Sequence, residues 1–189
     1  MQVGLYFGSF NPVHSGHLII ANHVLNETSL QKIWFVVSPQ NPFKSHELLN
    51  EKQRLSLVKK SIAGDKRFFA SNIEFGLPRP SFTVNTLTSL KKKYPNHKFS
   101  IVMGSDSFTE LHKWKDFELI IKTCKIFIYR RFGFEINNLF NAKIEILNAP
   151  FVDISSTEVR RLIKKGKSIR YLVPEKARRE IEKKNYYKK

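Results

Sequence analysis

The chain has 189 residues, 41% of them hydrophobic, which suits one α/β domain with a real core. It has no run of about 18 apolar residues, which excludes a membrane-spanning helix, and its first ten residues lack the features of a signal peptide. The lone cysteine, Cys124, excludes an internal disulfide and fits a reducing, cytoplasmic compartment.

The net charge of +17 has several possible sources. Binding of nucleic acid or of a polyphosphate substrate would explain it. The lysines, however, are scattered in short runs such as Lys59–Lys60, Lys91–Lys93 and Lys183–Lys184. Because such runs usually mark solvated helix faces, the charge favours a solvated surface and does not by itself define a partner.

In the first half of the chain, strand and helix patterns alternate. We expect a buried strand over Gln2–Phe7, a helix from Gly16 or His17 to Glu27, a strand over Lys32–Val37, a loop over Ser38–Asn50, a helix over Glu51–Ile62, an extended segment over Phe68–Phe75, and a helix within Ser81–Tyr94 after Thr83.

The second half continues the alternation. We expect a strand over Phe99–Met103, a short helix over Asp116–Ile121, strands over Cys124–Tyr129 and Ile144–Leu147, and helices over Ser156–Lys165 and Pro174–Lys184. The stretch Arg130–Asn141 has the least pattern and is expected to be a loop. No domain linker is evident.

This order predicts βαβ units in one domain, residues 1–189, with a Rossmann-like parallel sheet, helices on both faces and a small helical C-terminal part. Ligands of such sheets bind beyond the carboxyl ends of the strands. We therefore expect the chemistry just after Phe7, Val37, Met103 and Leu147.

The loop after the first strand carries the clearest signal, G-S-F-N-P-V-H-S-G-H from Gly8 to His17. Glycine lets the backbone approach a ligand closely. His14 and His17 are three residues apart at a helix start, so both imidazoles lie on one side of its first turn. The free N–H groups of that turn form an anion site, and two imidazoles beside it suit phosphate oxygens.

Other motifs are weaker. A zinc pair is not favoured, because no cysteine or acidic residue near His14 and His17 completes a tetrahedral set. No G-x-G-x-x-G follows a strand, Gly166-Lys167-Ser168 lacks the first glycine of a P-loop, and no G-x-S-x-G elbow exists.

A second phosphate anchor follows the last expected strand, D-I-S-S-T-E-V-R from Asp153 to Arg160. Serine and threonine before a helical pattern are capping residues. The hydroxyls of Ser156 and Thr157 and the helix start can hold a phosphate, and the Arg160 guanidinium, one turn further on, can bind its oxygens.

Together the two anchors resemble the signatures G-[ST]-F-[DN]-P-x-H-x-G-H and I-S-S-T-x-[IV]-R of the HxGH nucleotidyltransferases. Asn11 stands where many members carry Asp, a mild departure because Asn still hydrogen-bonds locally. Four further stretches resemble the nicotinate-nucleotide adenylyltransferase branch of this family. They are S-P-Q-N-P-F-K at 38–44, P-S-F-T-V-N-T-L at 80–87, M-G-S-D-S-F at 103–108 and L-H-K-W-K at 111–115.

The resemblance implies adenylyl transfer from ATP to nicotinate mononucleotide, with deamido-NAD and pyrophosphate as products and Mg²⁺ carried by the ATP phosphates. It implies catalytic roles for His14, His17, Lys44 and Arg160, ATP contacts from Gly8, Ser9, Phe10, His17, Gly104, Asp106, Ser156, Thr157 and Arg160, and substrate contacts from Lys44, Thr86 and Trp114. No protein metal site is expected.

Two other functions stay open at this point. One is a sibling transferase that acts on nicotinamide mononucleotide or phosphopantetheine, or that uses a cytidylyl donor. The other is a basic nucleic-acid-binding domain without enzymatic activity, which would need aromatic residues interleaved with Lys and Arg on one face. Most of the 16 Phe lie in apolar runs instead, so we expect no specific nucleic acid and no membrane partner. A homo-oligomer is left open.

Overall fold

The computed structural model describes residues 1–40, 48–138 and 140–188. Six parallel strands form one sheet in the order β3-β2-β1-β4-β5-β6. The strands are β1 (Gln2–Gly8), β2 (Lys32–Val37), β3 (Phe68–Ser71), β4 (Lys98–Gly104), β5 (Ile126–Tyr129) and β6 (Ile144–Leu147). The order reverses at β1, whose neighbours are β2 and β4, as in doubly wound nucleotide-binding folds.

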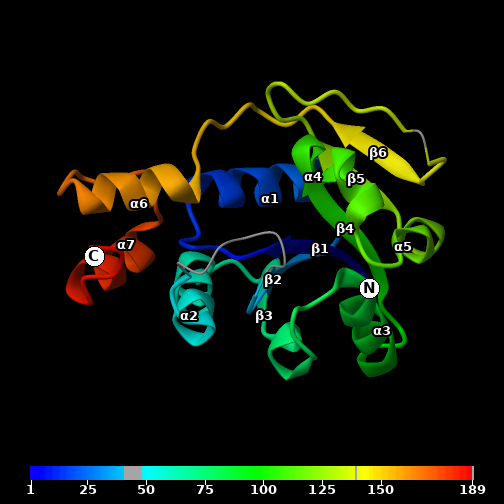
Figure 1. The fold of residues 1–189 in the computed structure, drawn as a ribbon, viewed down its shortest axis with the longest axis horizontal. Helices are drawn as coiled ribbons and strands as arrows, with labels where there is room; N and C mark the ends of the chain where they lie inside the picture. The colour runs from blue at the N-terminus through cyan, green and yellow to red at the C-terminus, as the bar shows by residue number, and fades with distance from the viewer. Residues whose placement is uncertain (41–47, 139, 189) are drawn as a thin grey trace.

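Helices cover both faces of the sheet (Figure 1). They are α1 (Ser15–Glu27), α2 (Glu51–Ser61), α3 (Thr83–Lys93), α4 (Ser105–Thr109), α5 (Phe117–Thr123), α6 (Ser156–Lys164) and α7 (Glu175–Lys183), with short 3₁₀ turns η1 (Ile73–Gly76) and η2 (Leu111–Lys113). The expected Rossmann-like architecture is confirmed. None of the described helices is long and apolar enough to cross a membrane.

The core has two layers because successive strand residues point to opposite faces. Val3 and Leu5 of β1 face a cluster with α3, α4 and α5, whereas Tyr6 faces a cluster with α1, α2, α6 and α7. Strands buried on both faces require continuous apolar runs, which is why segments such as KIWFVV were recognisable in the sequence.

Most of the expected elements agree with the observed ones within about two residues, the usual uncertainty of helix ends. The extended segment expected over Phe68–Phe75 is shorter, because β3 ends at Ser71 and η1 then turns Glu74 into the interior. The strand expected from Cys124 begins at Ile126, since the Cys124 N–H still donates to Ile120 O of α5 (2.9 Å). Helix α4 was not predicted.

The last two helices lie beside α1 and α2 rather than on a separate body (Figure 1). Glu180 of α7 is buried and contacts Lys60 of α2, and its Oε1 lies 3.4 Å from Ser56 Oγ. Ser15 N at the start of α1 donates to Leu172 O (2.7 Å). These contacts attach the C-terminal part to the helices nearest the first loop.

Candidate active site

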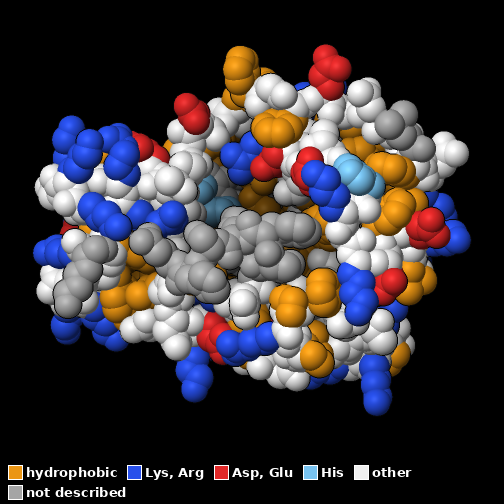
Figure 2. Space-filling view, in the orientation of Figure 1, with side chains coloured by type: hydrophobic (Ala, Val, Ile, Leu, Met, Phe, Trp, Pro, Cys, Tyr) orange, Lys and Arg blue, Asp and Glu red, His pale blue; other side chains and the backbone are white. Residues whose placement is uncertain are grey.

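Two adjoining cavities open at the carboxyl edge of the sheet, one of about 600 Å³ and one of about 440 Å³. The face drawn in Figure 2 is hollowed near its centre. Both cavities are lined by Tyr6, Phe7, Gly8, Asp106, Ser107 and Tyr129. They therefore meet above the ends of β1, β4 and β5, beside the switch point where ligands of such sheets bind.

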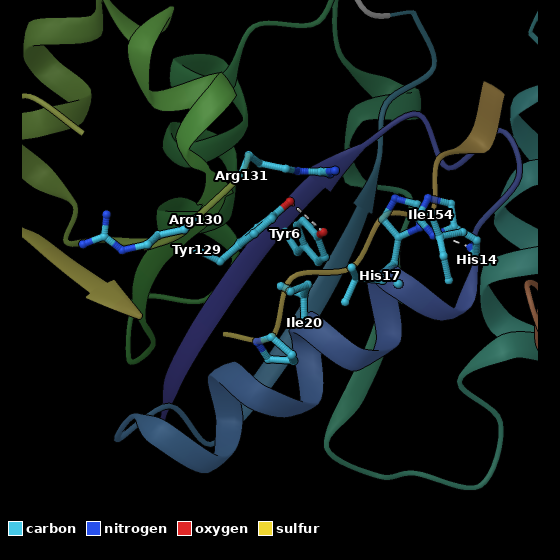
Figure 3. A pocket seen from close by; sticks show the side chains of 11 residues that line it. Tyr6, His14, His17, Ile20, Tyr129, Arg130, Arg131 and Ile154 are labelled. Atoms are coloured by element: carbon cyan, nitrogen blue, oxygen red, sulfur yellow. Dashed lines mark hydrogen bonds between the residues drawn. The ribbon is translucent and has the colours of Figure 1, made fainter. Parts of the chain in front are cut away.

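His14 and His17 line the larger cavity from the start of α1. They also line a small pocket beside it, which Figure 3 shows from close by. His14 is the N-cap residue, and its backbone N–H donates to Nδ1 of His17 (3.1 Å). The two rings are tilted by 34° to one another, with centroids 3.7 Å apart. The structure thus brings the two histidines together at a helix N-terminus, where an anion is favoured.

His14 is held neutral at physiological pH. Its side chain is buried, with 4% of the residue exposed. Burial, and next the positive charge of Arg131, lower the pKa of His14 from 6.5 to about 4. An imidazole of this kind offers a hydrogen bond to a phosphate oxygen without a prior positive charge, and it can gain a proton once negative charge is bound.

A close approach next to His14 explains why glycine occupies position 16. A Cβ at Gly16 would lie 3.0 Å from His14 Nδ1 and 3.0 Å from a methyl carbon of Val152. A larger residue would have to displace the histidine ring or the segment that leads into α6 by a few tenths of an ångström. The second glycine of the first motif therefore suits this close packing.

The two anchor motifs, far apart in the sequence, are joined by direct hydrogen bonds. Ser156 Oγ donates to Pro12 O (2.8 Å), and Arg160 Nη1 donates to Asn11 O (2.7 Å). Ser156, Thr157 and Arg160 line the same cavity as the histidines. Both motifs begin helices at this edge. The N–H groups of these helix starts and the Arg160 guanidinium are therefore hydrogen-bond donors to the same cavity.

Asn11 itself is buried, and its Oδ1 accepts a hydrogen bond from Leu49 N (3.1 Å). A carboxylate oxygen accepts this bond equally well, so the change from Asp keeps the local geometry. The hydrogen bond of Asn11 Oδ1 thus runs to a residue 38 positions further along the chain, whereas the sequence predicted a local one.

Arg131 is a site residue that the sequence did not reveal. It lines the larger cavity, its Nε lies 3.8 Å from Asp106 Oδ1, and its guanidinium lies over the Tyr129 ring, 5.5 Å from the centroid. Figure 3 shows it reaching across the end of β1 toward the histidines. Arg131 is the second residue after β5, and this place just beyond a strand end is the available signal. The sequence predicted chemistry only after Phe7, Val37, Met103 and Leu147.

Below Arg131, Tyr6 and Tyr129 share a hydrogen bond between their hydroxyl oxygens (3.0 Å), drawn as a dashed line in Figure 3. Burial, and then the neighbouring Tyr129, raise the pKa of Tyr6 well above its ordinary value. Tyr6 therefore stays protonated, and the two rings form a floor where the two cavities meet.

Gly8, Ser9, Phe10 and Asp106 all line the larger cavity, and Gly8, Gly104 and Asp106 line the smaller one. A Cβ at Gly104 would lie 2.3 Å from Asp106 Oδ1, so glycine lets this carboxylate fold back over the end of β4. Lys44 falls at 41–47, outside the described residues.

The smaller cavity is bounded by the start of α3 and by the segment around η2. Phe82 and Thr83 line it from α3, and the half-buried Trp114 lines it from the other side. Lys115 Nζ lies 5.0 Å from the centre of the Phe82 ring. The α3 start carries no side-chain cap, so its first N–H groups are available to an anion.

Thr86 differs from the other expected site residues. It is fully buried, is not among the residues that line either cavity, and donates through Oγ1 to Glu74 Oε1 (2.8 Å). Glu74 Oε2 accepts from Ser38 Oγ (2.7 Å), and Glu74 lines the smaller cavity. The structure therefore places Thr86 behind the cavity wall.

No group of three or more His, Cys, Asp or Glu within the described part of the chain is arranged to hold a metal ion. The two cavities instead gather hydroxyls, imidazoles, helix N-termini and guanidinium groups, which are donors suited to anions.

Comparison with known proteins gives a consistent match. Residues 5–162 fit the family model described as cytidylyltransferase-like. A protein from Flavobacterium johnsoniae named "Probable nicotinate-nucleotide adenylyltransferase" is 47% identical, with 100% of both chains covered. A protein of the same name from Cytophaga hutchinsonii is 44% identical, with 99% of this chain and 98% of that protein covered.

Among solved structures, Plasmodium falciparum nicotinic acid mononucleotide adenylyltransferase complexed with NaAD matches with a TM-score of 0.82 and 23% identity. The match covers 98% of this chain and 97% of that one. It shows that the two chains share a fold.

Proposed function

The chain belongs to the cytidylyltransferase-like family and, within it, to the nicotinate-nucleotide adenylyltransferases, and from this premise we propose that it makes deamido-NAD. It transfers the adenylyl group of ATP to nicotinate mononucleotide and releases pyrophosphate, a step of NAD biosynthesis. It acts as one nucleotidyltransferase domain over residues 1–189. The buried cysteine fits a cytoplasmic enzyme.

The observation that carries this proposal is the meeting of two unlike cavities at Gly8 and Asp106. The first, larger cavity is lined by phosphate-binding donors. The second, smaller cavity is lined by the Trp114 ring and the start of α3. ATP fits the first and the pyridine nucleotide fits the second. The phosphates of the two substrates then meet at the junction, as the transfer requires.

In this reaction the 5′-phosphate oxygen of nicotinate mononucleotide attacks the α-phosphorus of ATP. A new P–O bond forms, and the bond to the β-phosphate oxygen breaks, so pyrophosphate leaves with the electron pair. The attacking phosphate is already ionised and needs no general base. Positioning and stabilisation of charge are therefore the main contributions of the protein.

The roles follow the positions of the donors. His14 and His17 hold the phosphates, with His17 nearest the α-phosphate, and Ser156, Thr157 and Arg160 hold the β- and γ-phosphates. Gly8, Ser9 and Phe10 contact ATP from the first loop. Asp106, which lines both cavities just beyond β4, contacts ATP, and the neighbouring Gly104 approaches it from the smaller cavity. Lys44 lies outside the described residues, and its role follows from its sequence motif alone: it neutralises developing charge and contacts the mononucleotide.

Enzymes that transfer nucleotidyl groups from ATP generally use a divalent metal, and we assign Mg²⁺ here. The donors around the cavity suit anions rather than a hard cation, so the ion is carried by the ATP phosphates. When bound, it neutralises charge on the departing pyrophosphate.

On the other side of the junction, Trp114 stacks on the pyridine ring, and the start of α3 faces the ring carboxylate. Free helix N–H groups favour a negative charge, and this explains selection of the acid over the amide. Thr86 supports this wall through Glu74.

The test is pyrophosphate release by the purified protein with MgATP, comparing nicotinate mononucleotide with nicotinamide mononucleotide. We expect strong release with the acid alone. Equal release with both would remove the assigned specificity, and release with neither would contradict the proposal.

A variant pair tests the phosphate roles in the same assay. His17→Ala should lower kcat by about 10²–10³-fold, because one transition-state donor is lost. His23→Ala, on the same helix but outside both cavities, serves as the matched control and should keep the wild-type rate. An unchanged rate in His17→Ala would refute the role of His17.

A further inference from the structure

Arg54 of α2 is a buried arginine whose hydrogen bonds are unusual. Only 1% of it is exposed, and arginine is almost never so buried unless it is paired. Within the described residues the side chain of Arg54 donates its hydrogen bonds to backbone carbonyl oxygens. Glu51, three residues earlier on the same helix, forms its ion pair with Arg79.

The carbonyls that Arg54 binds come from separate parts of the site. Nη1 donates to Ser9 O (2.5 Å) and to Ser38 O (2.8 Å), which directly follow β1 and β2. Nη2 donates to Pro39 O (2.9 Å), and Nε donates to Leu49 O (2.7 Å). One guanidinium thus joins the loop after β1, the loop after β2 and the start of α2.

This connection extends to the phosphate side. Leu49 N donates to Asn11 Oδ1, and the Asn11 carbonyl accepts from Arg160. Both Ser9 and Arg160 line the larger cavity. A chain of bonds therefore runs from α2 through the first loop to the arginine at the start of α6.

Such an arrangement suits positioning more than stability. Burial of a cation carries a desolvation penalty, which lowers the pKa of Arg54. An apolar side chain at this point of α2 would avoid that penalty but would leave four carbonyls without their donors. The planar fork of arginine can bridge several acceptors at fixed angles, which the point charge of lysine cannot do.

We propose that Arg54 is a positioning residue for adenylyl transfer, fixing the loop after β1 against the loop after β2 so that the phosphate donors keep their spacing. The inference rests on the proposed function. Arg54 lines neither cavity and acts through Ser9 and its neighbours.

The test compares Arg54→Ala, Arg54→Lys and Leu57→Ala in the pyrophosphate assay, with thermal melting in the same buffer. Leu57 is a matched control, because it lies on the same helix, is also fully buried and belongs to the apolar core. We expect Arg54→Ala to lose about 10²-fold in kcat, since misplacement of about 1 Å has that effect. Leu57→Ala should lower the melting temperature while kcat at 25 °C stays near the wild-type value.

Guanidinium ion at millimolar concentration should raise the kcat of Arg54→Ala at least tenfold, to about a tenth of the wild-type value, and should leave Leu57→Ala unchanged. If Arg54→Ala does not fold, Arg54→Lys decides, with kcat reduced about tenfold and a melting temperature above that of Leu57→Ala.

Wild-type kcat in the Arg54 variants would overturn the positioning role. So would a loss of kcat that only follows the fall in melting temperature and equals the loss in Leu57→Ala. In both cases the proposed function stands. An inactive wild type would overturn the proposed function and this inference with it.

Discussion

At the scale of single residues, the buried His14 gives the protein a specific dependence on pH. Its folded pKa of about 4 lies below the ordinary 6.5, so between these values the unfolded chain binds a proton that the folded chain does not. Stability from this residue is therefore complete above about pH 6.5 and is lost as the pH falls toward 4.

The variant His14→Gln removes this contribution. Between pH 7.5 and 4.5, the wild type should lose about 2–3 kcal/mol more unfolding free energy than the variant, since each pKa unit corresponds to about 1.4 kcal/mol. Urea denaturation at both pH values measures the difference. Parallel losses in the two proteins would show that the folded protein protonates His14 normally.

A second residue-scale prediction concerns the hydroxyl of Thr86. Thr86→Val keeps the shape of the side chain but leaves the buried Glu74 carboxylate without one donor. We expect the unfolding free energy to fall by about 1–3 kcal/mol and the KM for nicotinate mononucleotide to rise. Urea denaturation and steady-state kinetics measure the two effects.

Thr86→Ser is the matched control, because it retains the hydroxyl and should keep the KM of the wild type. If Thr86→Val raised KM while leaving stability unchanged, Thr86 would be a direct ligand, as the sequence predicted, rather than a support for Glu74.

The sequence predicted that His14, His17 and Arg160 would lie at one site, because they belong to motifs of fixed spacing at helix starts. It did not predict where Arg54, Glu74 and Arg131 would lie. Arg54 lies among charged residues in E-K-Q-R-L-S-L-V-K-K and looks like part of a solvated face. Only the docking of α2 against the two loops turns it inward, and that is a tertiary property absent from any local pattern.

At the scale of elements, the start of α3 should decide between acid and amide substrates. Proline is tolerated at the first position of a helix, where the N–H is unused by the helix, and it favours extended backbone before it. Phe82 is already extended (φ −112°, ψ 137°). Thr83→Pro therefore removes one N–H from the cavity wall and leaves the helix intact.

We expect Thr83→Pro to reduce the ratio of kcat/KM for nicotinate mononucleotide over that for nicotinamide mononucleotide by about tenfold, the effect of one charged hydrogen bond. Thr83→Ala controls for the side chain, because it retains the N–H, and its ratio should stay near that of the wild type. An unchanged ratio in Thr83→Pro would move the source of specificity elsewhere in the cavity.

Long, strongly periodic elements could be predicted, whereas short ones could not. Helix α4 spans only five residues of the polar sequence S-D-S-F-T, with Phe108 as its main apolar anchor. Its existence depends on the packing of Phe108 beneath β4 and β5, not on local propensity. Likewise η1 forms because Glu74 turns inward to accept two hydroxyls, which no alternation in the sequence indicates.

At the scale of the whole molecule, the charge of +17 is spread unevenly. Lys and Arg side chains gather over the end of the molecule where α6 and α7 lie (Figure 2). Several of these arginines are already paired within their own helix, as Arg178 is with Glu175 and Glu182. The exposed Lys176 and Lys183 of α7 therefore serve as representatives of the solvated charge.

This distribution separates charge that serves the reaction from charge that only solvates the surface. In about 0.15 M salt, fields from exposed charges decay within about 8 Å. The double variant Lys176→Gln and Lys183→Gln should therefore leave kcat/KM within about twofold of the wild type.

Arg131→Gln, which removes a single charge beside His14, should lower kcat/KM by about 10²-fold, because a donor inside a partly dry cavity acts at much lower dielectric. Steady-state kinetics at 0.05, 0.15 and 0.3 M salt measures both. A large loss in the lysine variant that persists at 0.3 M salt would mean that the basic end of the molecule takes part in substrate capture.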